Sequence, residues 1–273
     1  MREKERKLLL FAGTTEGRML AEYLSKKRIA CYVSTATEYG KSLLQEEQLS
    51  DIIILAGRMN EEEIKTFLTE KKIDCVVDAT HPFARVVTEN IKAACAETKM
   101  DYLRCMRDGG GNKHTEKPKS ERFIVGSVQE AADFLAQTKG KILITTGSKE
   151  LACYQSIPDY KERCYARVLS TEQAVKDSHR LGFEGAHLIA MQGPFSEEMN
   201  RALLQQTKAA WLVTKDTGIT GGFPEKVRAA RSLGVRLVII RRPEESGLDY
   251  ESVLQVLEAV LEQKIEDNEL KGM

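Results

Sequence analysis

The chain has 273 residues, of which 42% are hydrophobic and 30% charged, which suffices for one large core or two domains of ordinary size. Its 41 basic residues balance 41 acidic ones, so nothing in the net charge predicts binding to nucleic acid or an anionic membrane. The apolar segment Leu8 to Ala12 is too short for a signal-peptide core or a membrane span, which predicts a cytoplasmic protein. The six cysteines have no Cys-x-x-Cys spacing and are expected to be reduced core residues, and the four histidines have no paired spacing that would indicate zinc.

The first predicted strand, Leu8 to Ala12, runs into a glycine turn and then into a helical pattern from Met19 to Lys27. A strand, a glycine turn and a helix form the context that a phosphate-binding loop requires, because the helix dipole favours an anion. Gly13 permits close backbone approach, whereas the alternative is an ordinary capped helix start. The residues of this candidate cofactor loop are Gly13, Thr14, Thr15, Glu16, Gly17 and Arg18.

The second predicted strand, Ile29 to Val33, ends at Ser34 and Thr35, where a dinucleotide-binding fold meets the adenosine ribose. NAD-selective proteins usually carry an acidic residue there, so the hydroxyl residues favour NADPH, with Arg18 as a candidate for its extra phosphate. A third strand, Ile52 to Ala56, ends at Gly57, and Asn60 caps the helix that follows it.

The fourth strand is the most informative stretch, because a β-branched run from Cys75 stops in the turn Asp78-Ala79-Thr80-His81-Pro82. A helical pattern follows at once, and a fifth strand is predicted from Met100 to Cys105. Ligands of open parallel sheets bind outside the carboxyl ends of the strands, where this turn offers a carboxylate, a hydroxyl and an imidazole. The alternative is that Asp78 and Thr80 only cap the next helix.

Residues Asp108 to Glu121 lack apolar periodicity and are rich in glycine and lysine, which predicts a linker or a mobile flap and a domain boundary nearby. We therefore expect domains at 1–120 and 121–273. The second domain repeats the format of the first, and the alternation of strands and helices predicts parallel, doubly wound sheets. Its predicted strands are 123–125, 141–144, 164–168, 187–190, 210–213 and 235–240, with helices at 128–137, 171–181, near 196, 226–233 and 250–263.

In order along the chain, seven motifs match one family. They are Gly13-Thr14-Thr15-Glu16-Gly17-Arg18, Val77-Asp78-Ala79-Thr80-His81-Pro82-Phe83-Ala84, Tyr102-Leu103-Arg104, Thr146-Gly147-Ser148-Lys149, Gly193-Pro194-Phe195-Ser196, Thr214-Lys215-Asp216-Thr217-Gly218 and Arg241-Arg242-Pro243. From about Leu8 to Pro243 the chain resembles the precorrin-6A reductase family of cobalamin biosynthesis, which includes the cobalt-precorrin-6A reductases. The segment around 109–118 looks divergent, so no role is carried into it.

The resemblance implies an α/β fold with two Rossmann-like domains, mainly parallel sheets and an active site in the cleft between them. It implies reduction of a double bond of precorrin-6A, or its cobalt form, to precorrin-6B by a reduced nicotinamide cofactor, for which Ser34 and Thr35 favour NADPH, with NADH as the alternative. The partner is then a tetrapyrrole, a flat ring edged with carboxylates that call for several cations. The protein itself is expected to be a monomer or a small homo-oligomer. A dinucleotide-sensing module and another two-domain nucleotide-dependent enzyme, such as a nucleotide-sugar transferase, remain alternatives.

Candidate residues follow from the motifs and from the strand ends. Besides the glycine turn, the cofactor-binding candidates are Ser34, Thr35, Gly57, Thr80, His81 and Pro82. The substrate-binding candidates are Arg85, Arg104, Ser148, Lys149, Gln192, Lys215, Asp216, Thr217, Gly218 and Lys226. The candidate proton donors are His81, Asp78 and Asp216, with solvent as the alternative. For Lys215, the competing interpretation is a structural ion pair with a neighbouring acid.

Overall fold

The computed structural model describes residues 7–47, 49–106, 121–218, 221–243 and 245–269, with residues 261–269 described by their backbone alone. The chain divides into two compact units, which are described separately below. Unit 1 comprises residues 1–108 and 244–273, and unit 2 comprises residues 109–243. The predicted segment Asp108 to Glu121 lies, except for Glu121, outside the described residues.

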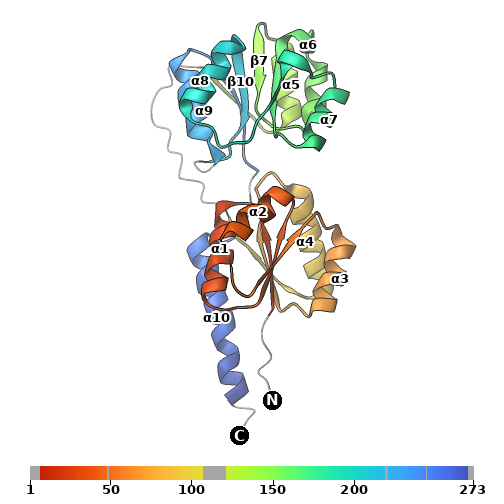
Figure 1. Ribbon diagram of the computed structural model, residues 1–273, viewed down its shortest axis with the longest axis vertical. Helices are drawn as coiled ribbons and strands as arrows, with labels where there is room; N and C mark the ends of the chain where they lie inside the picture. The colour runs from red at the N-terminus through yellow and green to blue at the C-terminus, as the bar shows by residue number, and fades with distance from the viewer. Residues whose placement is uncertain (1–6, 48, 107–120, 219–220, 244, 270–273) are drawn as a thin grey trace. The chain divides into compact units, whose positions relative to one another are not determined.

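Unit 1 is a parallel five-stranded sheet in the order β3-β2-β1-β4-β5, covered by helices on both faces (Figure 1). Its strands are β1 (Leu8–Ala12), β2 (Cys31–Thr35), β3 (Ile52–Ala56), β4 (Cys75–Ala79) and β5 (Asp101–Arg104). Its helices are α1 (Thr15–Lys26), α2 (Glu38–Glu46), α3 (Glu61–Lys71), α4 (Arg85–Thr98) and α10 (Tyr250–Glu269). Side chains cap several helix starts, and α3 begins with a reciprocal capping box between Asn60 and Glu63.

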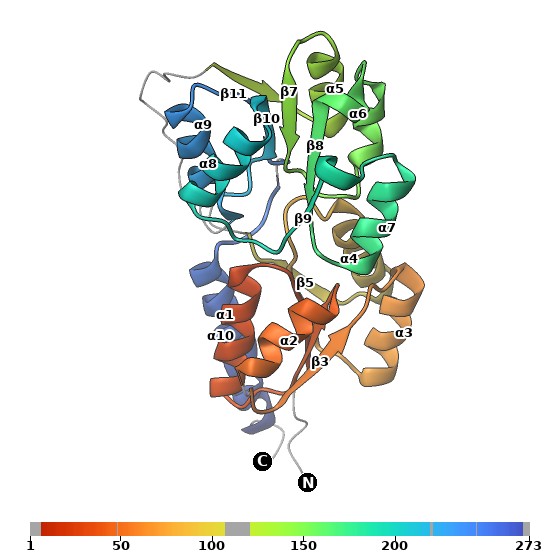
Figure 2. The same ribbon diagram turned by 45° about the horizontal axis from the view of Figure 1, so that its top comes forward.

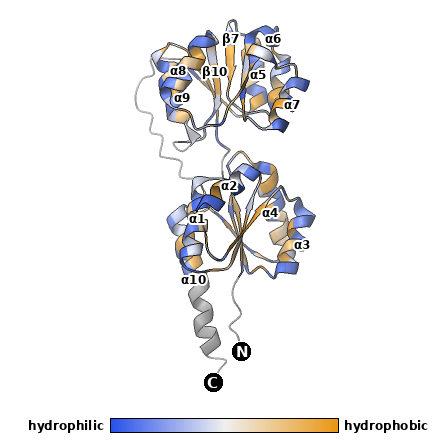
Figure 3. Ribbon diagram, viewed as in Figure 1, coloured by the Kyte–Doolittle hydropathy of each residue, from blue (hydrophilic) through white to orange (hydrophobic). Residues whose placement is uncertain are grey.

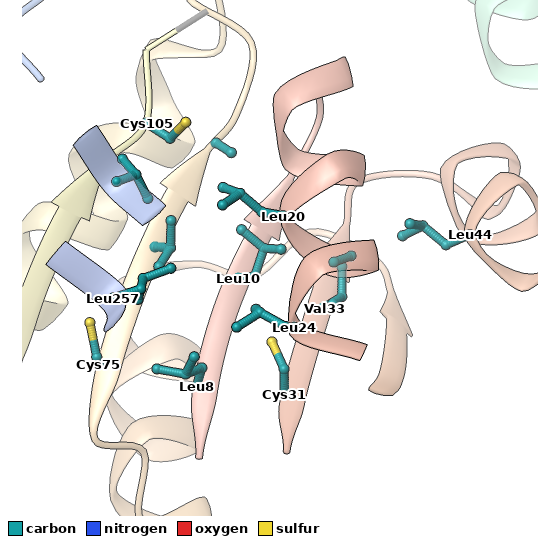
Figure 4. Close-up of a cluster of buried hydrophobic side chains, with 14 residues drawn as sticks. Leu8, Leu10, Leu20, Leu24, Cys31, Val33, Leu44, Cys75, Cys105 and Leu257 are labelled. Atoms are coloured by element: carbon teal, nitrogen blue, oxygen red, sulfur yellow. The ribbon is translucent and has the colours of Figure 1, made fainter. Parts of the chain in front are cut away.

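The central strand β1 is apolar on both faces, as expected of a strand covered by helices on both sides. Leu8 and Leu10 pack with α1 and α10, whereas Leu9 and Phe11 pack with α3 and α4. Figure 4 shows the first of these clusters, in which Leu10 lies among side chains of α1 and the neighbouring strands. In Figure 3 the strands are coloured mainly as apolar, while the helices carry both colours.

The C-terminal segment belongs to unit 1, which corrects the predicted boundary that placed residues 121–273 together. Val253 and Leu257 of α10 are fully buried in the cluster that holds Leu10. Before α10 begins, Leu248 pairs with the end of β5, donating its backbone N–H to the carbonyl of Arg104 at 2.8 Å. Helical periodicity predicted this helix but could not say which core its apolar face covers.

Unit 2 is a parallel six-stranded sheet in the order β6-β11-β10-β7-β8-β9 (Figure 2). Its strands are β6 (Arg122–Val125), β7 (Lys141–Ile144), β8 (Cys164–Val168), β9 (Leu188–Ala190), β10 (Ala209–Lys215) and β11 (Arg236–Ile240). Its helices are α5 (Val128–Ala136), α6 (Tyr160–Arg163), α7 (Glu172–Arg180), α8 (Glu197–Gln206) and α9 (Phe223–Ser232), with 3-10 turns η1 (Leu151–Ser156) and η2 (Gly185–His187). The strand pairings in both units confirm the predicted fold class of two Rossmann-like sheets, and the pairs between the described strands are all parallel.

Each sheet has one point at which the strand order reverses, and such a point is where open α/β sheets bind ligands. In unit 1 the chain moves outward from β1 through β2 to β3 and then returns to β4, so the reversal lies between β1 and β4. In unit 2 the corresponding neighbours are β7 and β10. The glycine turn follows β1 and the Asp78 turn follows β4, so the fold brings these two predicted site segments together.

Five of the six cysteines are buried, which confirms their predicted place in the core, and Cys153 is half-buried. Burial raises the pKa of Cys31 to about 12, so its thiol stays protonated at neutral pH.

Within the described ranges, no helix combines the length and the apolar character that crossing a membrane requires. Nor do the described residues contain a group of three potential metal-ligating side chains.

Gly17, in the first turn of α1, is required by the close approach of that helix to the sheet. A Cβ atom at this position would lie 3.1 Å from Cα of Ala12 and 3.2 Å from Cβ of Ala79. We expect Gly17→Val to lower the free energy of unfolding by about 1–3 kcal/mol, because α1 has to move away from β1 and β4. Urea denaturation measures this loss, and a variant as stable as the wild type would contradict the inferred close packing.

Candidate functional site

The loops that follow β1 and β4 contact each other at the strand-order reversal of unit 1. The Thr14 hydroxyl donates a hydrogen bond to the carbonyl oxygen of Ala79 at 3.0 Å. A Cβ atom on Gly13 would lie 3.4 Å from Cα of Thr80 and from the backbone nitrogen of His81. Gly13 is itself exposed, so its bare backbone faces outward beside the β4 turn.

The glycine turn opens α1 in the way that an anion-binding loop requires. Thr14 is the N-cap, and its hydroxyl accepts a hydrogen bond from the Gly17 N–H at 3.2 Å. The α1 N-terminus therefore begins directly after β1, with its positive dipole end at the turn. Thr15 is half-buried there, and Arg18 is exposed, with Nε 3.8 Å from a carboxylate oxygen of Glu22.

Glu16 differs from its expected role as a cofactor contact. Its side chain is buried, and Oε2 has no hydrogen-bond partner among the described residues. Its charge contributes to the raised pKa of the Cys105 thiol, after the larger effect of burial, so the carboxylate lies towards the interior rather than on the rim of the turn. We therefore remove Glu16 from the cofactor-binding candidates.

The hydroxyls that follow β2 also lie elsewhere than expected. Ser34 and Thr35 are buried, and the Thr35 hydroxyl is within hydrogen-bond distance of the carbonyl oxygens of Leu55 and Thr37. Thr35 therefore joins β2 to β3 instead of presenting a donor to a ribose, and the buried Ser34 is no better placed. Gly57, at the end of β3, is exposed with a φ of 129°, so its backbone stays accessible at this edge.

The Asp78 carboxylate is part of a buried polar network and is not exposed, which corrects its expected role as a proton donor. It is 0% exposed, and its Oδ1 accepts hydrogen bonds from the Thr80 N–H at 3.0 Å and the Thr80 hydroxyl at 2.7 Å. Oδ2 accepts the Tyr102 hydroxyl at 3.0 Å. Burial and the neighbouring Asp78 charge raise the pKa of Tyr102 well above its usual range, so this phenol keeps its proton and remains a donor.

Arg104 is the cation of this network, and its position corrects its expected role as a substrate contact. Its Nη1 donates to Asp78 Oδ1 at 2.6 Å, and its Nη2 donates to the Thr80 carbonyl at 3.1 Å and to Glu245 Oε1 at 2.8 Å. The side chain is buried. Arg104 therefore fixes the backbone of the β4 turn and connects it to the C-terminal segment through Glu245, so both of its Nη atoms already have acceptors within unit 1.

The rest of the β4 turn is more accessible. His81 is half-buried, its Nδ1 accepts the Phe83 N–H at 3.3 Å, and its ring stacks on that of Phe83 at 5.7 Å. Pro82 is buried, whereas Arg85 is exposed at the first position of α4, a helix without a side-chain cap. His81 is therefore the candidate proton donor that the structure keeps accessible in unit 1.

In unit 2, the segments after β7 and β10 also lie together. The Thr145 hydroxyl donates to the carbonyl of Val213 at 2.8 Å. Lys215 forms an ion pair with Glu150, which is the structural pairing that the competing interpretation expected. Ser148, Lys149, Thr217 and Gly218 lie in the same loops, while Gln192 is exposed after β9.

Asp216 and its neighbours form a compact turn at the end of β10. Its Oδ1 accepts the Gly218 N–H at 3.2 Å, which closes a turn over residues 216–218, and the Thr217 hydroxyl donates to the Gly221 carbonyl at 3.0 Å. Asp216 is half-buried, so it stays a candidate proton donor.

Among the described residues of unit 2, Arg167 and Lys226 are buried cations, and the sequence analysis predicted a binding role for one of them. Lys226 in α9 was among the substrate-binding candidates, whereas Arg167 in β8 was missed. The available signal was a basic residue inside the short strand-forming run from Cys164 to Val168.

Comparison with known proteins assigns the chain to a family. The family model described as precorrin-6x reductase CbiJ/CobK matches residues 7–262. The chain belongs to the precorrin-6x reductase family. It is 34% identical to a cobalt-precorrin-6A reductase of Priestia megaterium, with 94% of this chain and 98% of that protein covered. It is also 33% identical to a cobalt-precorrin-6A reductase of Methanothermobacter thermautotrophicus, over 89% of this chain and 79% of that protein.

Membership of the precorrin-6x reductase family agrees with the fold. A solved structure described as CobK precorrin-6A reductase superposes with a TM-score of 0.70 at 24% identity, covering 93% of this chain and 96% of that one. At this identity, the superposition supports the architecture of two parallel sheets and no residue roles. The roles rest on the geometry described above.

Proposed function

We propose that the protein reduces a double bond of precorrin-6A or cobalt-precorrin-6A, yielding the 6B product, with NADPH as the reductant. Family membership carries the reductase assignment. The observation that supports a dinucleotide is the exposed Gly13 between the α1 N-terminus and the β4 turn, at the strand-order reversal of unit 1. The cobalt form is the substrate to test first, because the two relatives above are described as cobalt-precorrin-6A reductases.

The residues of unit 1 fit a dinucleotide phosphate. Gly13 is exposed and carries no Cβ atom, and Thr14 and Thr15 stand at the first turn of α1. Arg18 is exposed one turn further along, where it would neutralise the extra phosphate of NADPH. Gly57, Thr80, His81 and Pro82 remain the candidate contacts on the ends of β3 and β4. When bound, the cofactor supplies the hydride.

The chain's own residues then bind the macrocycle and move one proton. Ser148, Lys149, Gln192, Lys215, Thr217 and Gly218 remain substrate-binding candidates of unit 2, and Arg85 remains one of unit 1. Reduction of a carbon–carbon double bond also consumes a proton. Asp78 is enclosed by its hydrogen-bond donors. The candidate sources of this proton are therefore His81, Asp216 and solvent.

Gly13→Val provides a test of the cofactor site. We expect the added side chain to cover the turn and to weaken NADPH binding at least a hundredfold, or about 2.7 kcal/mol. Little stability should be lost, because the added Cβ atom itself would lie 3.4 Å from the nearest atoms. Gly126→Val is a matched control, since Gly126 follows β6 as Gly13 follows β1, and the atoms nearest to its added Cβ would be those of the Glu130 carboxylate, from 3.3 Å. A folded Gly13→Val variant with normal NADPH affinity would place the cofactor elsewhere.

The function itself is tested by incubating the protein with NADPH or NADH, with and without cobalt-precorrin-6A, and following nicotinamide oxidation. We expect oxidation that depends on the tetrapyrrole and is at least tenfold more efficient with NADPH. A tenfold preference for NADH, about 1.4 kcal/mol, would reverse the cofactor assignment. Dinucleotide binding without turnover of either precorrin would instead indicate a sensing module.

A further inference from the structure

Unit 2 contains two buried basic side chains close to each other, Arg167 on β8 and Lys226 on α9. Arg167 is 6% exposed and Lys226 is 8% exposed. The charge of Arg167 acts on Lys226, where it adds to the effect of burial in lowering the pKa of the lysine to about 8. Two cations thus share an environment with little water, which is costly unless an anion compensates them.

Neutral groups hold Arg167 in place. It follows Tyr165 by two residues on β8, so both side chains lie on the face where Tyr165 packs with α8 and α9. Its Nη1 donates to Asn200 Oδ1 at 2.8 Å, and its guanidinium lies 4.1 Å from the centre of the Phe195 ring. The Asn200 amide is held in turn by the Ser196 carbonyl at 2.8 Å. The guanidinium is oriented, but its charge has no carboxylate partner among the described residues.

The Lys226 side chain also has no hydrogen bond or ion pair to another described residue, although the charge of Glu225 partly offsets the lowering of its pKa. The adjacent acid, Glu225, accepts instead from Arg228 Nη2 at 2.8 Å. Lys226 lies in the first turn of α9, which begins after Gly222, and the positive end of the helix dipole adds to the local charge. Arg167 is the penultimate residue of β8, at the carboxyl end of the sheet, where ligands of such folds bind.

We propose that Arg167 and Lys226 together bind one carboxylate of the tetrapyrrole substrate, with Asn200 and Phe195 as positioning residues that orient the guanidinium. This inference rests on the proposed function. A guanidinium offers two parallel donors to a carboxylate, and the lysine adds a third donor and a second charge. One anion would thus satisfy both cations, neither of which forms an ion pair with a carboxylate in the described part of unit 2.

Lys226→Met tests this site because it removes the charge and keeps an unbranched side chain of similar length. We expect the affinity of the full-length protein for cobalt-precorrin-6A to fall by about ten- to a hundredfold. The NADPH affinity should stay unchanged, and the melting temperature without substrate should rise, because an uncompensated buried charge is gone. Lys226→Gln is the second variant, with the same expected loss of affinity. Lys176→Met, at an exposed lysine of α7, controls for the loss of one positive charge.

Unchanged affinity for cobalt-precorrin-6A in Lys226→Met and Lys226→Gln would overturn the inference while leaving the proposed function intact. A lower melting temperature in both variants would also overturn it, because Lys226 would then have a stabilising partner within the protein. Inorganic phosphate is the second probe. If it stabilises the wild type but neither variant, while tetrapyrrole affinity is unaffected, the site binds a free oxyanion and not the substrate. A wild type that neither binds nor reduces the tetrapyrrole would refute the proposed function and this assignment with it.

Discussion

Arg104→Leu is expected to lower the free energy of unfolding by about 3–5 kcal/mol, because it leaves the buried Asp78 carboxylate without its cation. The loss also breaks the contact of Nη2 with Glu245, so the C-terminal segment loses one of its ties to β5. Denaturation in urea, followed by circular dichroism, measures the change. Arg104→Leu should also weaken NADPH binding, because Arg104 holds the Thr80 carbonyl and its loss would loosen the β4 turn.

Arg180→Leu is the matched control for this prediction. Arg180 is 74% exposed in α7, and its ion-pair partner among the described residues is Asp177 one turn away, so the same substitution should change stability by less than about 1 kcal/mol. If Arg104→Leu proved no more destabilising than this control, the network around Asp78 would not stabilise unit 1. Restored stability in a variant with both Asp78 and Arg104 replaced by apolar residues would locate the cost in the unpaired carboxylate.

The second large effect is a pH-dependent gain in stability for Lys226→Met. The unfolded chain keeps the lysine proton up to about pH 10.5, whereas burial lets the folded protein release it near pH 8. Unfolding between these values takes up a proton, so the wild type becomes more stable as pH rises through this window. Below pH 8 the full cost of the buried charge is present, on the order of 3 kcal/mol.

We therefore expect Lys226→Met to exceed the wild type in stability at pH 7 and to lose that advantage by about pH 10.5. Fluorescence of Trp211, the single tryptophan, follows the unfolding of unit 2, since this residue is buried in β10. Lys176→Met should show no such pH dependence. An advantage that persists unchanged at high pH would mean that better apolar packing, and not the removal of a charge, stabilises the variant.

The sequence predicted most strands because each is a short apolar run that ends in a polar or glycine-containing turn. The helix α2 was missed, since Leu44 is the one residue within it that is buried and Gly40 interrupts its pattern. The short elements η1 and α6 were also missed, because a single turn carries too little periodicity to be recognised. The unit to which α10 belongs could not be predicted, because it depends on long-range packing and not on the local sequence pattern.

The candidate site was predicted as a set of segments, and less well as individual contacts. Strand topology alone brings the Gly13 and Asp78 turns together, so their position followed from the order of the elements. A polar side chain at a strand end can face a ligand or the interior of the protein. Which of the two it does depends on the hydrogen-bond partners that the fold brings close to it. Asp78 and Arg104 satisfy each other, and Thr35 bonds to the neighbouring strand, so the residue types alone pointed to the wrong role.

The discontinuous composition of unit 1 has a consequence for how the protein matures during synthesis. Unit 2 occupies residues 109–243, so its whole sequence is synthesised before Val253 and Leu257 are added. These two side chains complete the core around Leu10, and Glu245 completes the partners of Arg104. The segment made first therefore keeps an open hydrophobic face until the last segment has been made, so unit 1 cannot follow the usual amino-terminal-first order of folding. A nascent chain stalled before residue 244 should expose the first sheet to chaperones and proteases.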